Sequence, residues 1–565
     1  MSSKLVASTC ALAALAFGTI PAPPAGAHSL PPFDGEKLLA TDPPAENAPP
    51  EEIREYLLGL IRGLSPAERA FYRLLFRAFN RPDDDDGAVW SELAGLDRPG
   101  APPFSIQSGA GDARSADLEM ALDDLEAPRS MGADPEPGPL MAGVAVVDIT
   151  PPRGCPLGGT GRWREDLLHH DDELDPAWYS KFFWPPEDVH DPILAKFIVL
   201  DNGQRRIVLG GLDTVGFSAH LFRTMTDQLQ DLGIHRENFF ISATHNHSGP
   251  GAMNLLPFLW FGAMDIYDAR VAEPLIDEMA DGVRAAVADL EPARIGYVTG
   301  PDEVGLSRNS RDDVEKVDPT IGVLRIDKAD GSPKAVLFNF AAHVTALDSE
   351  WRYMSRDFSG FAEDWVEDGL GENVVAFHVN GAEGDQVSDS HGRSNLDAAI
   401  WVGEQLGAQV LDLWATIVPA DEVELDVERK IKWMGSPHSR PGLWDSEYPM
   451  VPWWFVLPLS GTVETKARVA ALRIDDLLIH SIPGEAIYDV GVKIRDHAHG
   501  KGYEDVWTFG LTNNYISYMT TWEEYWQGGY QAAASLFGPH TGRKMINTSK
   551  GVINRISRRW DGRER

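Results

Sequence analysis

The sequence predicts an α/β fold for the long part of the chain that begins near residue 141. Short β-rich runs such as "LAKFIVLDNGQRRIVLGGLDTVGF" alternate with amphipathic helical segments. In "AEPLIDEMADGVRAAVADL" the apolar residues recur at helical spacing and form one stripe, as a helix packed on a core requires. Strand–helix alternation of this kind is typical of an α/β domain. The stripe comprises Leu275, Ile276, Met279, Val283, Val287 and Leu290.

Residues 1–27 have the features of a secretory signal peptide. Lys4 precedes the apolar run "LVASTCALAALAFGTI", and "AGA" at 25–27 fits a signal-peptidase site. We therefore expect a secreted or periplasmic protein. Cys10 would be removed with the signal, so Cys155 would remain alone and could form no internal disulfide.

Residues 28–140 are expected to form an acidic linker and a helical hairpin in front of the main domain. "EEIREYLLGLIRG" and "LSPAERAFYRLLFRAFNRP" supply the two helices. The second helix has a clear start, because Ser65 and Glu68 can form a capping box. A run of Asp, Gly, Ala and Pro residues then leads to the α/β domain.

The charge of the chain excludes two classes of partner. The formal net charge is −36 at pH 7, which opposes binding to nucleic acid and adsorption to anionic membranes. After the signal, no segment reaches about 18 uninterrupted apolar residues, so no stable membrane anchor is expected.

The segment "ISATHNHSGPG" places His245 and His247 directly after an apolar run. If "NFFISATH" is a strand, the two side chains share one face, about 6.5–7 Å apart. Two imidazoles in this arrangement suit zinc or a similar divalent ion, and ordinary hydrogen-bonded histidines are the alternative. The chain has neither an H-E-x-x-H helix nor a clear G-x-S-x-G elbow, which argues against a simple zincin or α/β-hydrolase.

Three further polar residues stand at or near the ends of apolar runs. His343 closes "AVLFNFAAH", Glu485 follows the Pro-Gly turn of "LLIHSIPGE", and Tyr518 lies in "WTFGLTNNYISYMTTWEEYW". Each of them, taken alone, also fits a structural role. Strand ends are nevertheless where sites gather in α/β proteins.

Several motifs resemble the neutral (alkaline, non-lysosomal) ceramidase family. "ATHNHSGPG" resembles the family's "THTHSGPGG", and "PGEAIYDVGVKIRD" resembles "PGEFTTMSGRRLR". "NNYISYMTTWEEYWQGGYQAAASLFGPHT" is similar to the family's long run that ends in "GPHT". "NFAAHVTAL", "GLSRNS" and "AGVAVVDIT" with "LGGTG" match further family segments in order. The resemblance covers about residues 141–545 and implies a catalytic domain over 141–565, built from mixed sheets flanked by helices.

The resemblance also implies a zinc site and the roles of its neighbours. The family's zinc ligands fall on His245, His343, Glu485 and Tyr518. His247 would contact the bound water or the amide oxygen, and Arg308 matches a substrate-contacting arginine. Tyr530, twelve residues after Tyr518, would donate a hydrogen bond to the developing oxyanion, which would lower the barrier by roughly 3–4 kcal/mol.

The family's serine turn differs in this chain. The family has "GDVSP", whereas this chain has "NGAEGDQVSDSHG", so Ser388 aligns only with a one-residue insertion. Ser388 is the counterpart of the family serine, or that serine is missing. In either case zinc-activated water is the nucleophile that we prefer, because zinc lowers the pKa of bound water to near neutrality.

The implied function is a secreted zinc amidohydrolase that cleaves the N-acyl bond of ceramide or a related lipid amide. Only about 25 residues follow the "GPHT" run, so the family's C-terminal β-sandwich is expected to be missing. The aromatic run "YPMVPWWFVLPLSG" at 448–461 could line an acyl groove, although we favour a buried strand.

Two other functions stay open. One is a metal-dependent ester or phosphate hydrolase on the same scaffold, with Asp213, His190, Asp191 and Asp385 as candidates for a second metal. Turn and capping roles are the alternative for these four residues. The other function is that of a non-catalytic relative of the family, which the near-complete set of predicted ligands argues against.

Overall fold

The fold is described from a computed structural model, which covers residues 135–159, 179–311, 314–371, 373–440, 457–459 and 462–561. The predicted signal peptide, linker and helical hairpin lie outside these residues, as does most of the aromatic run at 448–461. Among the residues described, no helix combines the length and apolar character needed to cross a bilayer.

The main element is an eight-stranded mixed sheet, which confirms the predicted fold class. Its interior pairs are antiparallel, whereas the pair at each edge is parallel. Each parallel pair is joined through a helix, as a parallel connection requires: α7 (Ala219–Asp227) at one edge and α10 (Asp357–Leu370) at the other. In spatial order the strands are β14 (Val375–Asn380), β12 (Pro333–Phe340), β11 (Thr320–Lys328), β9 (Glu291–Pro301), β2 (Met141–Asp148), β5 (Leu194–Asp201), β6 (Arg206–Leu212) and β7 (Phe239–Ala243).

A second, four-stranded sheet packs on one face of the first. Alternate residues of the large sheet, such as Ile198 and Leu200, meet apolar residues of the small sheet in one buried cluster. Because strand side chains alternate, Phe197 and Val199 point to the other face. The small sheet has the order β17 (Leu425–Trp433), β20 (Lys466–Ile474), β21 (Leu477–Ser481) and β23 (Val506–Phe509).

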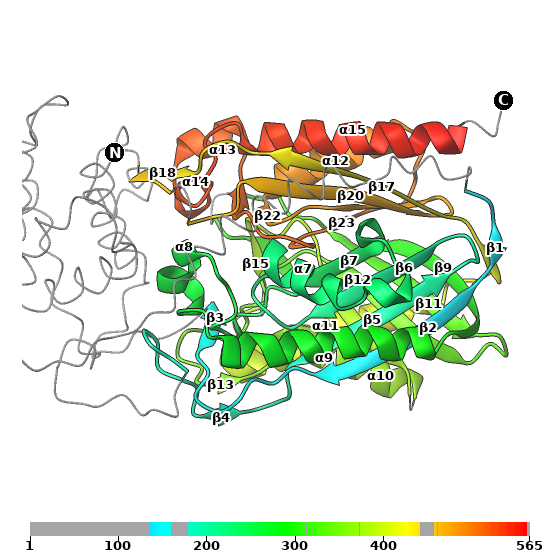
Figure 1. The fold of residues 1–565 in the computed structure, drawn as a ribbon, viewed down its shortest axis with the longest axis horizontal. Coiled ribbons are helices and arrows are strands. Elements are labelled where there is room, and N and C mark those ends of the chain that lie inside the picture. Colours follow the sequence, from blue (N-terminus) through cyan, green and yellow to red (C-terminus); the bar gives the residue numbers. More distant parts are fainter. Residues whose placement is uncertain are drawn as a thin grey trace, which may run out of the picture.

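Helices cover the outer face of both sheets, so the molecule has four layers (Figure 1). α12 (Tyr488–His499) and α15 (Thr541–Asp561) pack on the small sheet. On the large sheet lie α7, α9 (Ala269–Ala288), α10 and α11 (Asn395–Trp414). The predicted apolar stripe is confirmed in α9: four of its members are buried, and Val287 and Leu290 pack against them while partly buried.

Short strand pairs join the loops at the sheet ends. Three of them concern the site: β3 (Leu157–Gly159) with β8 (Ser248–Pro250), β10 (Ser307–Asn309) with β15 (Gln386–Ser388), and β22 (Glu485–Ala486) with β24 (Tyr518–Met519). The remaining short elements are β1 (Gly138–Pro139), β4 (Asp188–Val189), β13 (Tyr353–Met354), β16 (Glu422–Val423), β18 (His438–Ser439), β19 (Leu457–Pro458), α8 (Pro257–Leu259), a π-turn at Trp260–Met264, α13 (Trp522–Gln527), α14 (Tyr530–Ala533), and 3-10 turns at Gln230–Leu232 and Arg236–Asn238.

The large sheet curls, which brings its two edges together at the site. A Cβ on Gly211 in β6 would lie 2.6 Å from the ring of Phe377 in β14, so the two strands face each other closely. Asn380, at the end of β14, donates to the carbonyl of Thr244, just beyond β7, at 2.9 Å. The same amide donates to Ala342, just beyond β12, at 2.8 Å. Asn380 therefore ties together the two loops that carry the predicted histidine ligands.

Candidate metal centre

His245 and His247 lie in the loop between β7 and β8, so the predicted strand through both histidines is wrong. β7 ends at Ala243. The backbone of His245 then adopts a left-handed conformation, with φ of 67°. This turn brings the ring centroids of His245 and His247 to 4.7 Å, with the rings edge to face. The turn in this loop, and not the alternation of side chains along a strand, therefore brings the two imidazoles together.

Asn246, between the two histidines, holds the loop. Its side chain donates to the Ser355 carbonyl at 2.7 Å and accepts from the Ser248 backbone at 2.9 Å. Asn246 is fully buried. Because its donor and acceptor are both used inside the protein, Asn246 fixes the loop against the segment that precedes α10.

The four predicted ligands come together, although they arise from widely separated segments. His343 follows β12, Glu485 opens β22, and Tyr518 is paired beside Glu485 in β24. Glu485 Oε2 lies 3.3 Å from His245 Nε2 and 3.2 Å from His343 Nε2. The Tyr518 hydroxyl lies 3.0 Å from His343 Nε2. We call these four residues the histidine centre.

These separations fit a tetrahedral metal site. Donor atoms about 2.0–2.2 Å from a tetrahedral zinc ion lie about 3.3–3.6 Å from one another. The two carboxylate–imidazole separations agree with that spacing, and the donor set is two imidazoles, one carboxylate and one phenol. His245, His247 and His343 form a second, overlapping set, with donor atoms within 4.8 Å of one another. The described residues are therefore compatible with a bound divalent ion.

Backbone carbonyls orient both ligand histidines. Nδ1 of His245 lies 2.6 Å from the Val215 carbonyl, and Nδ1 of His343 lies 2.9 Å from the carbonyls of Glu383 and Gln386. A proton on Nδ1 satisfies these carbonyls and leaves Nε2 as the lone-pair nitrogen. This arrangement is typical of histidines that bind metals.

His247 stands beside the centre as a neutral base. Burial and the neighbouring His245 and His343 lower its pKa well below the ordinary value. Its ring lies over Gly159, where a Cβ would come within 2.6 Å of the imidazole, and Gly159 has φ of +103°. A glycine is needed at 159 for both reasons.

Tyr530 lies at the rim of the centre. Its ring meets the ring of Tyr518 edge to face, with centroids 5.2 Å apart. The residue is 51% exposed overall, yet desolvation of its hydroxyl and the nearby charge of Glu485 raise its pKa to about 12. Tyr530 therefore keeps its proton at neutral pH and can donate a hydrogen bond.

Two predicted site residues do not join the cluster. Arg308 is exposed on β10, and its guanidinium donates to the Asn309 carbonyl at 3.4 Å. Ser388 ends β15 opposite Ser307, two residues beyond the Gln386 carbonyl that orients His343. In the described ranges neither residue makes a hydrogen bond or ion pair with the histidine centre.

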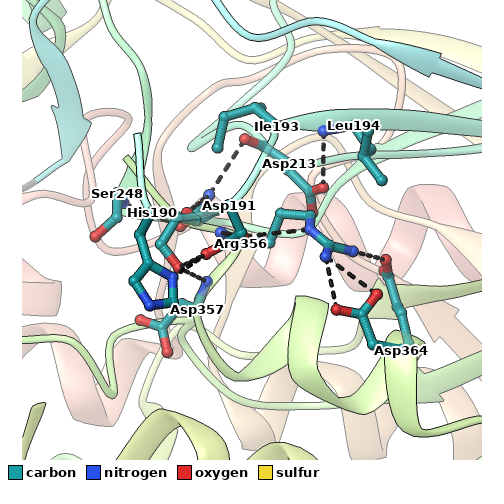
Figure 2. Close-up of polar contacts among 12 residues, drawn as sticks. His190, Asp191, Ile193, Leu194, Asp213, Ser248, Arg356, Asp357 and Asp364 are labelled. Atoms are coloured by element: carbon teal, nitrogen blue, oxygen red, sulfur yellow. Dashed lines mark hydrogen bonds and ion pairs between the residues drawn. The ribbon is translucent and has the colours of Figure 1, made fainter. Parts of the chain in front are cut away.

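The candidates for a second metal do not gather at one point. Asp385 accepts from the backbone of Tyr488 at 2.7 Å and from Asn309 at 3.1 Å. Asp191 pairs instead with Arg356, and the exposed His190 pairs with Asp191 (Figure 2). In the part of the chain that the structure describes, three imidazoles form a cluster of donor groups that could hold a metal, and none of these four candidates belongs to it.

The ion network around Arg356 lies against the loop that carries His245 and His247. It contains its own cations. Arg356 lies between Asp191 and Asp364, and Asp213 lies near Arg356 (Figure 2). Lys196 lies 3.0 Å from Glu363 and 2.8 Å from Glu367. We call this set the arginine network; its members are Asp191, Lys196, Asp213, Arg356, Glu363, Asp364 and Glu367.

Sequence reasoning missed three residues that shape the site: Asn246, Asn380 and Tyr515. Asn380 closes an apolar run, as several predicted ligands do, and that position was the available signal, whereas Tyr515 follows two asparagines and gave none. Their partners are backbone carbonyls or a carboxylate in distant segments, which no local pattern reveals.

Comparison with known proteins places the chain beside one family. The family model described as neutral/alkaline non-lysosomal ceramidase, N-terminal, matches residues 189–388 and 460–547. The neutral ceramidase of Mycobacterium tuberculosis is 24% identical over 388 residues, which are 54% of this chain and 61% of that protein. The neutral ceramidase of Pseudomonas aeruginosa is 21% identical over 490 residues, 67% of this chain and 69% of that protein. The chain thus spans about three fifths of the mycobacterial relative.

Solved structures show the same fold. The crystal structure of the Pseudomonas aeruginosa neutral ceramidase matches with a TM-score of 0.60 at 20% identity, over 74% of this chain and 75% of that one. A ceramidase complexed with C2 matches with a TM-score of 0.62 at 20% identity, over the same shares.

Proposed function

Because the chain belongs to the neutral/alkaline non-lysosomal ceramidase family, we propose that it hydrolyses the N-acyl amide bond of ceramide or a related lipid amide, with zinc bound at the histidine centre. One observation carries the proposal. Two imidazoles, a carboxylate and a phenol from four distant segments converge at separations that suit one tetrahedral ion. The ceramidase structure complexed with C2 supports the substrate class.

Each side chain has a stated task. His245, His343, Glu485 and Tyr518 would hold the ion, which supplies a Lewis acid and lowers the pKa of a water molecule toward neutrality. His247, beside them, would accept a hydrogen bond from that water or orient the amide oxygen. Tyr530 would donate a hydrogen bond to the oxygen that becomes negative as the amide is attacked. Removing one such donor typically lowers kcat by about 100- to 1,000-fold.

The test is amide cleavage with defined substrates. Purified protein is freed of metal, and zinc is then returned to one half of the sample. Each half is incubated with N-acylsphingosine and with simple N-acyl amino acids, and the free amine is measured. We expect sphingosine release that depends on zinc. Zinc-loaded protein that leaves lipid amides intact but cleaves esters or phosphates would favour the other hydrolase function, and inertness toward all three would favour a non-catalytic relative.

We also propose that the protein is exported, with cleavage after Ala27. The proposal depends on the features of the first 27 residues. Intact-mass measurement of protein from the culture medium or periplasm tests it. Cytosolic protein that retains Met1 would refute it.

A further inference from the structure

Tyr515 contacts the ligand carboxylate from the side opposite the imidazoles. It lies three residues before Tyr518, in the loop between β23 and β24. Its hydroxyl donates to Glu485 Oε1, whereas Oε2 of the same carboxylate faces the two histidines. The two carboxylate oxygens therefore have different partners, one a phenol and the other the position of the ion.

The ring of Tyr515 rests on the segment that orients His245. A Cβ on Gly216 would lie 3.2 Å from Cδ2 of Tyr515, so the absence of a side chain there lets the ring lie close. The neighbouring Val215 supplies the carbonyl 2.6 Å from His245 Nδ1. One short segment after β6 thus positions two predicted ligands, His245 directly and Glu485 through Tyr515.

A second buried carboxyl lies near Glu485 without holding it. Glu383 is fully buried near Glu485 and Tyr515, and burial together with the charge of Glu485 raises its pKa well above the ordinary value. Neither of its carboxylate oxygens has a hydrogen-bond partner among the described residues. Oε1 of Glu485 is therefore held by the Tyr515 hydroxyl, and the nearby Glu383 contributes no hydrogen bond to it.

We propose that Tyr515 is a positioning residue, which fixes Glu485 through Oε1 so that Oε2 is held for the metal. The inference rests on the proposed zinc site and names a residue outside the ligand set. Tyr515 itself touches neither the ion nor the substrate in this account. Partners of this kind typically contribute about 10- to 100-fold to metal affinity or activity.

The experiment measures zinc affinity, not turnover alone. Metal-free wild-type protein, Tyr515→Phe and the control Tyr503→Phe are titrated with zinc against a chromophoric chelator. Tyr503 is a suitable control because it is buried and stacks on Trp560, with ring centroids 4.6 Å apart, in the α12–α15 layer. Tyr515→Phe should raise the zinc Kd by about 10- to 100-fold, and Tyr503→Phe should leave it unchanged.

Two further readouts separate positioning from general damage. Metal-free Tyr515→Phe should keep the melting temperature of metal-free wild-type protein within a few degrees. At saturating zinc its kcat should fall while KM stays constant. Gly216→Ala displaces the ring without removing the hydroxyl, so it should weaken zinc binding in the same direction by a smaller factor, and it serves as the test if Tyr515→Phe does not fold.

The outcomes discriminate between the two proposals. Wild-type protein that binds zinc, together with a folded Tyr515→Phe variant of equal affinity, would overturn the role of Tyr515 alone. Wild-type protein that binds no zinc would overturn the proposed function and this inference together.

Discussion

The histidine centre and the arginine network both place carboxylates in largely buried surroundings, but they balance charge differently. The arginine network holds Arg356 and Lys196, which are 4% and 2% exposed, against its acidic groups. The histidine centre contains a carboxylate, imidazoles and a phenol, and neither Lys nor Arg is among its four members. A buried charge needs a partner. The network supplies two cations of its own, whereas the donor groups of the centre are compatible with a metal ion from outside.

The two regions lie against each other along the loop that carries His245. Asn246 bonds the Ser355 carbonyl at 2.7 Å, and the neighbouring Arg356 donates its backbone N–H to Asp191 at 2.8 Å. The arginine network thus holds one side of the loop in place, and the His245 imidazole of the same loop belongs to the histidine centre. Stability and metal binding should therefore respond to different substitutions.

The largest effect is expected from removing a ligand. His343→Ala takes away one of four donors, so both zinc and amidase activity should fall to background. Elemental analysis and sphingosine release measure the two quantities. The control is His497→Ala, because His497 lies in α12 and bonds Asn554 at 3.0 Å, away from the centre. A His343→Ala variant that keeps its zinc would refute the ligand assignment.

Breaking the arginine network should instead affect folding. Arg356→Met leaves Asp191 and Asp364 without their guanidinium partner and leaves Glu363 with Lys196 alone, which should lower the free energy of unfolding by about 3–5 kcal/mol. The protein that remains folded should still bind one zinc ion per chain. Arg270→Met, which removes an exposed pair with Asp268, should cost at most about 1 kcal/mol. Both free energies of unfolding are measured by urea unfolding of metal-free protein. An equal decrease in the two variants would contradict a special role of the arginine network in folding.

Prediction from sequence succeeded where the pattern was local. The α/β class and the stripe of α9 follow from periodicity, and the β-rich run quoted above forms the strands β5 and β6. The positions of His343, Glu485 and Tyr518 were suspicious because each lies at or near the end of an apolar run. Their convergence came only from family resemblance, since curling of the large sheet and pairing of β22 with β24 depend on contacts between distant segments.

The conformation of the histidine loop could not be predicted for a physical reason. An apolar run that ends in "ATHNH" is equally compatible with a longer strand. The turn at His245 is instead stabilised by hydrogen bonds to distant segments, above all from Asn246 to Ser355 and from Asn380 to Thr244. Tertiary contacts decided the backbone against local propensity.

A smaller, pH-dependent effect is expected beside the network, at Asp357. Burial raises the pKa of Asp357 to about 7 from an ordinary 3.8. The folded state therefore favours the protonated form, and this contribution to stability is complete below about pH 4 and is lost as the pH rises to about 7. Asp357→Asn stays neutral, so the metal-free variant should gain about 1 kcal/mol relative to wild type between pH 6 and 7. A difference that does not change with pH would contradict the shifted pKa.

The smallest effect is expected at Ser388. It makes no hydrogen bond or ion pair with the centre among the described residues, so Ser388→Ala should retain turnover within about two-fold if zinc-activated water is the nucleophile. Loss of a true nucleophile would lower kcat by about 1,000-fold or more. Steady-state amide hydrolysis at saturating zinc distinguishes these results, and the larger loss would return the serine to the mechanism.

Anomalous diffraction at the zinc edge, from crystals of protein purified without chelator, tests the central claim most directly. If zinc binds at the histidine centre, we expect one strong peak per chain, within about 2.0–2.3 Å of donor atoms from His245, His343, Glu485 and Tyr518. A zinc-replete crystal with no peak there, or with its peak among the carboxylates around Arg356, would contradict it.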